Sequence, residues 1–274
     1  MMSFLTRQEL WHGPSRVWWA VLAFTVSYVW ICRGRLTTRS WWFAAAMLVL
    51  ASAFVSPIGA LSRGYMFSAH MIQHLLLLLI VPLCLMLSLP VREQTEKSSR
   101  LVNLAGRLPL LGWIAGLGAM WFWHVPSLCS AATESTSLGV IRSTTFLLAG
   151  LAFWLPIFAP LKSLRLPPLS AVVYLFSACL GCTLLGIYIT FTSISVCPAF
   201  ANPANTLGVL GSLRAAGFSA SLDQQLGGLL MWVPPCSLYV CAIIGVLCRW
   251  YAAEAATAPV NASRGLSALS KVKS

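Results

Sequence analysis

Seven stretches of this chain are rich in apolar residues, nearly free of charge and separated by more polar segments. A helix of roughly 20 apolar residues crosses a hydrocarbon layer of about 30 Å. Backbone polar groups inside that layer must be satisfied within their own segment, which favours helices. We therefore predict an all-α polytopic membrane protein, a bundle of about seven transmembrane helices. The stretches are Val17–Cys32, Trp41–Leu61, Phe67–Leu89, Leu108–Val125, Gly139–Ala159, Leu169–Phe191 and Leu226–Trp250.

The composition supports this class of protein. With 58% hydrophobic and 9% charged residues, the chain has too little polar surface to cover a soluble globule of 274 residues. Residues 1–251 are expected to form a single transmembrane domain. Residues 252–274 are rich in Ala and Ser with scattered basic residues, and we predict a disordered basic cytoplasmic tail there.

The distribution of positive charge predicts the orientation. Most of the 18 lysines and arginines lie in alternate connecting segments, namely Arg33–Arg39, Arg92–Arg107, Lys162–Arg165 and Arg249–Lys273. Positive residues near span ends are retained on the cytoplasmic side, so we place the N-terminus outside and the C-terminus inside. The net charge of +12 is then mainly a topology signal. It favours contact with membrane lipid, whereas nucleic acid is not expected as a partner.

The four histidines are all predicted at the outer face. His70 and His74 lie in the first two turns of the third stretch, and their i, i+4 spacing places them on one helix face. His124 ends the fourth stretch, just before a proline, and His12 precedes the first. Ionisable groups in membrane spans are usually functional, so we interpret His70 and His74 as metal ligands. Alternatively, interfacial histidines serve as hydrogen-bonded anchors, the interpretation we prefer for His12.

Asp223 is the acidic residue beside the outer end of the seventh stretch. A carboxylate there could orient a ligand imidazole or bind a metal directly. The alternative is structural, because Ser221 and Gln224 have capping-box spacing and an acidic residue stabilises the first turn of any helix. The two interpretations carry equal weight at this stage.

Cysteine and methionine add soft donors on the same side. Cys129 and Cys197 fall in predicted outer loops, where they could form a disulfide or contribute ligands. Met66, Met71 and Met120 also lie towards this face. Thioether, thiolate and imidazole together suit cuprous copper better than zinc or iron, although methionine in a membrane helix is ordinarily filler. The candidate metal ligands are therefore His70, His74, His124, Asp223, Met66 and Cys129.

Three motifs resemble the CtaG family of multi-spanning bacterial cytochrome c oxidase assembly proteins. They are Ser68-Ala-His-Met-Ile-Gln-His, Trp123-His124-Val-Pro126, and Asp223-Gln-Gln-Leu-Gly-Gly followed by Pro234. The resemblance runs from about Trp11 to Tyr251. It implies a protein of the bacterial inner membrane that supports the copper centre of a haem-copper oxidase. Its matching positions include Gln73, Trp123, Gln224 and Gln225 beside the histidines and Asp223.

The chain departs from the family pattern in two places. Cys129-Ser130 stand where a Tyr-Asp pair is usual, and Arg142-Ser143 stand where Glu-His is common. These departures remove potential ligands and put an arginine in place of an acid. The segment 193–222 is also long for the family, and we expect an interfacial helix within 207–218.

The resemblance and the histidine layer lead to one functional hypothesis. We expect a non-catalytic assembly factor that captures copper at the outer face and passes it to a cytochrome c oxidase subunit, with a periplasmic copper donor as a further possible partner. Two alternatives stay open. Histidines on facing helices could hold a haem in an electron-transfer protein, or kinked helices with a polar mouth could belong to a metal transporter.

Overall fold

A computed structural model describes residues 8–11, 13–35, 37–91, 99–201, 211, 215 and 217–272, excluding the side chains of 8–9, 99–105 and 257–272. His12, which we interpret as an interfacial anchor, and most of the predicted interfacial helix within 207–218 lie outside these residues. The elements are η1 (Gln8–Trp11), α2 (Arg16–Ile31), α3 (Ser40–Val55), α4 (Pro57–Leu61), α5 (Phe67–Leu75), η2 (Leu76–Ile80), α6 (Val81–Ser88), α7 (Ser99–Trp123), α8 (Pro126–Glu134), α9 (Thr136–Phe158), η3 (Lys162–Leu164), α10 (Pro168–Phe191), η4 (Pro198–Phe200) and α12 (Ala220–Val272).

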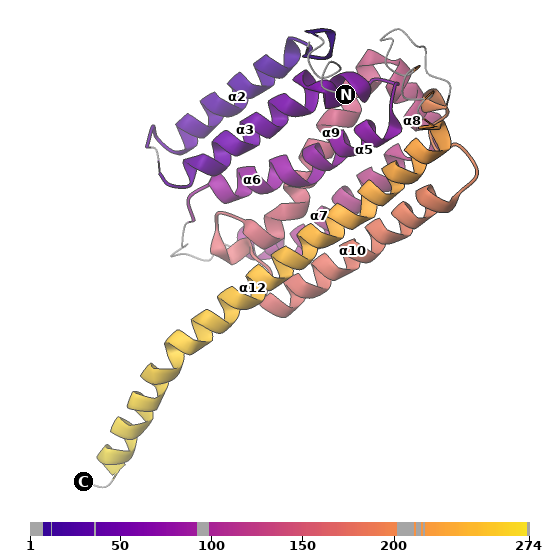
Figure 1. Ribbon diagram of the computed structural model, residues 1–274. Coiled ribbons are helices and arrows are strands. Elements are labelled where there is room, and N and C mark those ends of the chain that lie inside the picture. Colours follow the sequence, from indigo (N-terminus) through magenta and orange to yellow (C-terminus); the bar gives the residue numbers. More distant parts are fainter. Residues whose placement is uncertain are drawn as a thin grey trace.

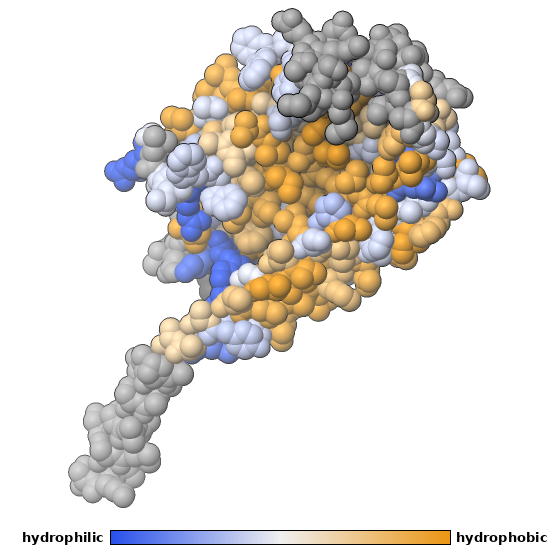
Figure 2. Space-filling view, in the orientation of Figure 1, coloured by the Kyte–Doolittle hydropathy of each residue, from blue (hydrophilic) through white to orange (hydrophobic). Residues whose placement is uncertain are grey.

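The all-helical class is confirmed, and the chain is a membrane protein. Four helical segments are long and apolar enough to cross a membrane: Phe67–Ser88, Thr136–Phe158, Pro168–Phe191 and Ala220–Ala256. A fifth candidate is the pair Gly106–Trp123 and Pro126–Glu134, bent by 79°. The helices α2 and α3 have 16 residues each, which is about 24 Å of helix. Figure 2 shows apolar residues over much of one face, as expected for lipid contact.

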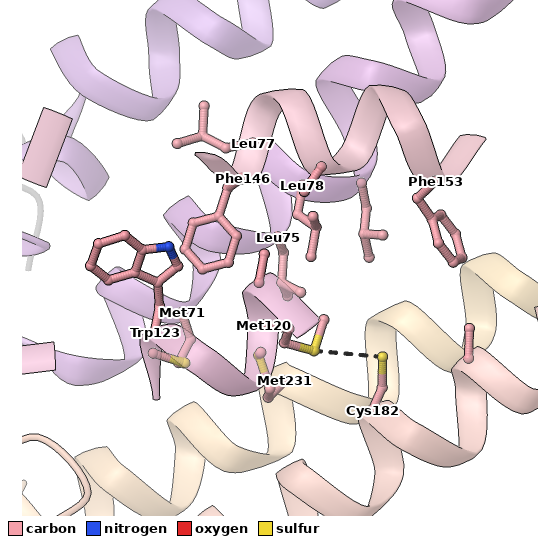
Figure 3. Packing of buried hydrophobic residues seen from close by; sticks show 14 of the residues in the cluster. Met71, Leu75, Leu77, Leu78, Met120, Trp123, Phe146, Phe153, Cys182 and Met231 are labelled. Carbon is pink, nitrogen blue, oxygen red and sulfur yellow. Dashed lines mark hydrogen bonds between the residues drawn. The ribbon is translucent and has the colours of Figure 1, made fainter. Parts of the chain in front are cut away.

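The helices pack as one bundle with α5, α6 and α9 near its centre (Figure 1). The helices α2 and α3 lie side by side on one flank, and α10 and α12 pack along each other on the other. Buried Trp154, Phe146, Met71 and Met231 belong to a continuous apolar core between these layers (Figure 3).

The second predicted stretch, Trp41–Leu61, was expected to be one helix, but the structure divides it into two helices, α3 and α4. The helix α3 ends at Val55, and Ser56 turns the chain into α4 by accepting a hydrogen bond from the Ile58 amide at 3.2 Å. Pro57 has no N–H to donate to the carbonyl of Ala53, which disfavours continuation of the helix.

A glutamine side chain replaces the backbone hydrogen bond that is lost at Pro57. The carbonyl of Ala53, which Pro57 cannot serve, accepts a hydrogen bond of 2.7 Å from Nε2 of Gln73. This bond joins the end of α3 to α5. Gln73 therefore contributes to the bundle by replacing a missing helical hydrogen bond, and it fixes α5 one residue before His74.

A π-helical turn, η2, follows the histidine-bearing helix directly. Pro82 cannot donate to the carbonyl of Leu78, and Gly150 of α9 packs against that carbonyl. The next carbonyl, of Leu79, accepts a hydrogen bond of 3.0 Å from the indole of Trp154. Short π-helical turns often occur at functional sites. Here the turn lets α9 approach the centre of the segment Phe67–Ser88 closely.

Helix α12 continues to Val272, through the segment predicted to be a disordered tail. The prediction of disorder stays a prediction. At the end of the bundle opposite the histidines, Arg39 and Arg249 lie near enough to Arg165 for their charges to act on it. Burial lowers the pKa of the Arg165 guanidinium, and repulsion by Arg249 and Arg39 lowers it further. Basic residues from three connecting segments therefore gather at one end.

Candidate metal centre

Asp223 holds the start of the helix that carries the histidines. One carboxylate oxygen accepts a hydrogen bond from the Phe67 amide at 2.7 Å. The other accepts bonds from the amide and hydroxyl of Ser68, at 3.0 and 2.6 Å. Asp223 is 1% exposed, and the hydrogen bonds that its carboxylate accepts within the described structure come from these two residues. Its carboxylate thus satisfies amides that the first turn of α5 cannot pair internally.

The structure therefore favours a structural role for Asp223, but not through the capping box predicted for α12. The hydroxyl of Ser219, two residues earlier than Ser221, accepts a hydrogen bond from the Leu222 amide at 3.1 Å. Gln224 instead binds the preceding loop. Its side chain accepts from the Val196 amide at 2.9 Å and donates to the Ile194 carbonyl at 3.1 Å.

His70 and His74 form a buried pair one turn apart on α5. Their ring centroids are 4.0 Å apart and the rings meet edge to face, at 89°. The Nδ1 atom of His70 lies 3.3 Å from the carbonyl oxygen of Ser62. Nε2 of His70 and Nδ1 of His74 have no hydrogen-bond partner among the described residues. An unsatisfied buried polar group costs about 1–3 kcal/mol, so adjacent unpaired nitrogens indicate a site for a missing partner.

His124 joins this pair from the break between α7 and α8. Its ring centroid lies 5.6 Å from that of His74. Nδ1 contacts the carbonyl oxygen of Met120, which can only accept, so the proton is assigned to Nδ1. Nε2 of the neutral ring then carries a lone pair, and it lies 3.3 Å from the sulfur of Met71.

This nitrogen to sulfur separation suits two ligands of one ion. Metal distances of about 2.0 Å to nitrogen and 2.3 Å to sulfur, as at zinc sites, span 3.3 Å at a near-tetrahedral angle. Met71 was named at the sequence level only as one of three outer methionines. The sequence feature that could have marked Met71 as a ligand is its position between His70 and His74 on α5. The structure places the Met71 sulfur beside His124, whereas half-buried Met66 meets His70 through its backbone carbonyl, which accepts a hydrogen bond from the His70 amide at 3.2 Å.

Cys129 is not a free ligand in this structure. It forms a disulfide with Cys197, with Cα atoms 5.6 Å apart, and of the two options open at the sequence level the structure contains the disulfide. Within the described part of the chain, no three His, Cys, Asp or Glu side chains are grouped so as to hold a metal ion. The donors that do converge are imidazole nitrogens and one thioether.

The disulfide anchors the segment that carries Phe200, which lies against the histidines. Cys197 directly precedes the short helix η4, whose Phe200 lies 4.9 Å from the His70 ring and 5.7 Å from the Phe67 ring, centroid to centroid. Phe146 of α9 lies 4.4 Å from the His74 ring. Aromatic rings therefore enclose the imidazoles and limit their contact with water.

Arg142 brings a positive charge close to the histidines. It is 6% exposed, and its described hydrogen bond goes to the hydroxyl of Thr133 at 3.3 Å. The charge acts electrostatically on both His70 and His74. A nearby cation opposes the binding of another, and the penalty is smaller for a monovalent than for a divalent ion.

The haem alternative has little geometric support. A macrocycle held by axial histidines of facing helices must lie between their rings, and the described rings that face each other from different helices, His74 of α5 and His124 at the end of α7, have centroids only 5.6 Å apart. His74 is also closed in by Phe146.

The fold and site define a class, a helical membrane protein with a buried imidazole and thioether cluster near one end of its bundle. A family model described as cytochrome c oxidase caa3 assembly factor matches residues 16–253. The chain belongs to this family. Comparisons with curated proteins and with solved structures gave no match.

Proposed function

We propose that this assembly factor binds cuprous copper through His124 and Met71, with His70 and His74, and passes it to a cytochrome c oxidase subunit. The observation that carries the proposal is the His124 nitrogen 3.3 Å from the Met71 sulfur, beside two unpaired buried imidazole nitrogens. Soft neutral donors favour cuprous copper. The charge of Arg142 also disfavours a divalent ion more than a monovalent one.

Transfer requires a site that is incompletely coordinated, so that an incoming ligand can displace a bound one. His70 and His74 serve this purpose because they adjoin the outer loop that carries Phe200, 4.9 Å from His70. Movement of that loop would open the site to an oxidase subunit. In this proposal the protein binds and releases an ion and does not catalyse a reaction.

We also infer seven spans, with α2, α3 and the broken pair of α7 and α8 added to the four long helices. The basic end that contains Arg39, Arg165 and Arg249 would face the cytoplasm, and the histidine end would face the periplasm of a bacterial inner membrane. This orientation would expose the site to a periplasmic copper donor.

The test compares Met71→Leu with Met231→Leu in purified full-length protein loaded with cuprous copper. Both methionines are 0% exposed and belong to the same core (Figure 3), so the two variants lose the same atoms from similar surroundings. Met71→Leu should lower the affinity by at least about tenfold, the effect of losing about 1.4 kcal/mol. Met231→Leu should bind like the wild type.

Histidine variants test the transfer step in cells. His70→Gln, His74→Gln and His124→Gln should each reduce oxidase activity, measured alongside the amount of membrane-inserted protein. Full oxidase assembly in all three variants would refute the delivery of copper by this cluster. Equal copper affinity in the two methionine variants would refute the thioether ligand.

A further inference from the structure

A polar cavity of about 140 Å³ lies beside the histidine helix at the same end of the bundle. Three arginines line it, and the described lining residues include no acidic side chain. Hydroxyl groups and one amide complete the polar lining. The polar lining residues are Arg16, Arg63, Arg142, Ser62, Gln73, Thr133, Ser135, Thr136 and Ser143. This composition is that of an anion site.

Arg142 is the strongest indication of a missing anion. Its guanidinium has five N–H donors, whereas the described structure provides one hydrogen bond, to Thr133. It is 6% exposed and lies in a helix long enough to span the membrane. Buried charges in proteins are normally paired, because an isolated one is costly to desolvate. A phosphate group in the cavity would supply both the charge and the acceptor oxygens.

A second cavity continues from the first into an apolar region. It has a volume of about 180 Å³ and shares Arg16, Phe54, Gly139 and Ser143 with the polar cavity. From the shared residues it follows α9 as far as Leu147, over about 12 Å of helix. Its remaining lining is Val17, Ala20, Leu50, Leu77, Val140, Thr144 and Leu147. The exposed side chains of Val140 and Thr144 show that this groove opens on the outer surface of the bundle.

We infer that the two cavities together bind one anionic phospholipid. Its phosphate lies among the arginines and one acyl chain lies in the groove between α2, α3 and α9. The adjoining apolar groove favours a lipid over free phosphate, because a free anion would leave it unfilled. The inference does not depend on copper binding, since no proposed copper ligand lines either cavity.

The test measures the thermal stability of full-length protein in a neutral detergent after adding phosphatidylglycerol, phosphatidylcholine or inorganic phosphate. Phosphatidylglycerol should raise the midpoint of unfolding most and should remain bound in native mass spectra. Arg142→Gln and Arg16→Gln should each weaken its binding by about tenfold, since bonds to charged groups contribute at least that much. Arg16 is exposed, so its variant tests the site even if Arg142→Gln fails to fold.

Two further variants separate the phosphate from the acyl chain. Ala20→Phe places a ring in the apolar groove and should weaken phosphatidylglycerol binding with all arginines intact. Arg107→Gln removes an exposed arginine of α7 that lines neither cavity, and it should bind like the wild type. Equal loss in Arg107→Gln and Arg16→Gln would overturn the site. Stabilisation by inorganic phosphate that equals that of the lipid, with no effect of Ala20→Phe, would overturn the lipid assignment.

Discussion

Replacing Asp223 by asparagine should destabilise the protein strongly, although this residue touches no histidine. The carboxylate accepts three hydrogen bonds, from the Phe67 amide at 2.7 Å and from the Ser68 amide and hydroxyl at 3.0 and 2.6 Å. Asparagine keeps one acceptor, but its NH₂ group would face an N–H donor. Hydrogen bonds to charged groups contribute about 1.5–3 kcal/mol each. The substitution removes one hydrogen bond and leaves the remaining bonds with a neutral acceptor in place of a charged one. Together these losses predict about 3 kcal/mol of destabilisation.

Thermal unfolding in detergent, followed by tryptophan fluorescence, provides the assay. For a chain of this size, a loss of about 3 kcal/mol lowers the unfolding midpoint by about 6–12 °C. The matched control is Ser221→Ala, an exposed residue in the same first turn of α12 whose hydroxyl makes no hydrogen bond within the described structure. Ser68→Ala should cost less than Asp223→Asn because it removes only one of the three bonds. If Asp223→Asn melted like Ser221→Ala, the carboxylate could not be fixing α5, and the reasoning would be wrong.

Two other substitutions test the packing. Gly150→Ala would place Cβ against the Leu78 carbonyl, which cannot move without shifting the π-helical turn, so it should lower the unfolding midpoint by several degrees. Gly118→Ala meets nothing within 4 Å and should be neutral or slightly stabilising; the reverse ranking of their midpoints would contradict the close approach of α9. Alkylation before reduction, read by mass spectrometry, should leave Cys129 and Cys197 unmodified. Modification of both residues would show that the covering loop is not tied down.

The general nature of the protein could be predicted from the sequence. Long apolar stretches require helices in hydrocarbon, whatever they pack against. The one-turn spacing of His70 and His74 places both on one face of α5 from local geometry alone. The family resemblance was likewise carried by short motifs, and the match over residues 16–253 confirms it. The break at Pro57 was missed, because hydropathy does not register the missing N–H of a proline.

The identity of the groups around those histidines required the tertiary structure. Asp223 lies 156 residues from its partner Phe67, and spacing along the chain could not reveal that its carboxylate caps another helix. Equally, Met71 and Met66 are the same kind of residue, but only Met71 points to His124. Helix periodicity determines which residues share a face. Which faces meet, and therefore which donors converge and where Arg142 is buried, depends on the packing order of helices that are distant in sequence.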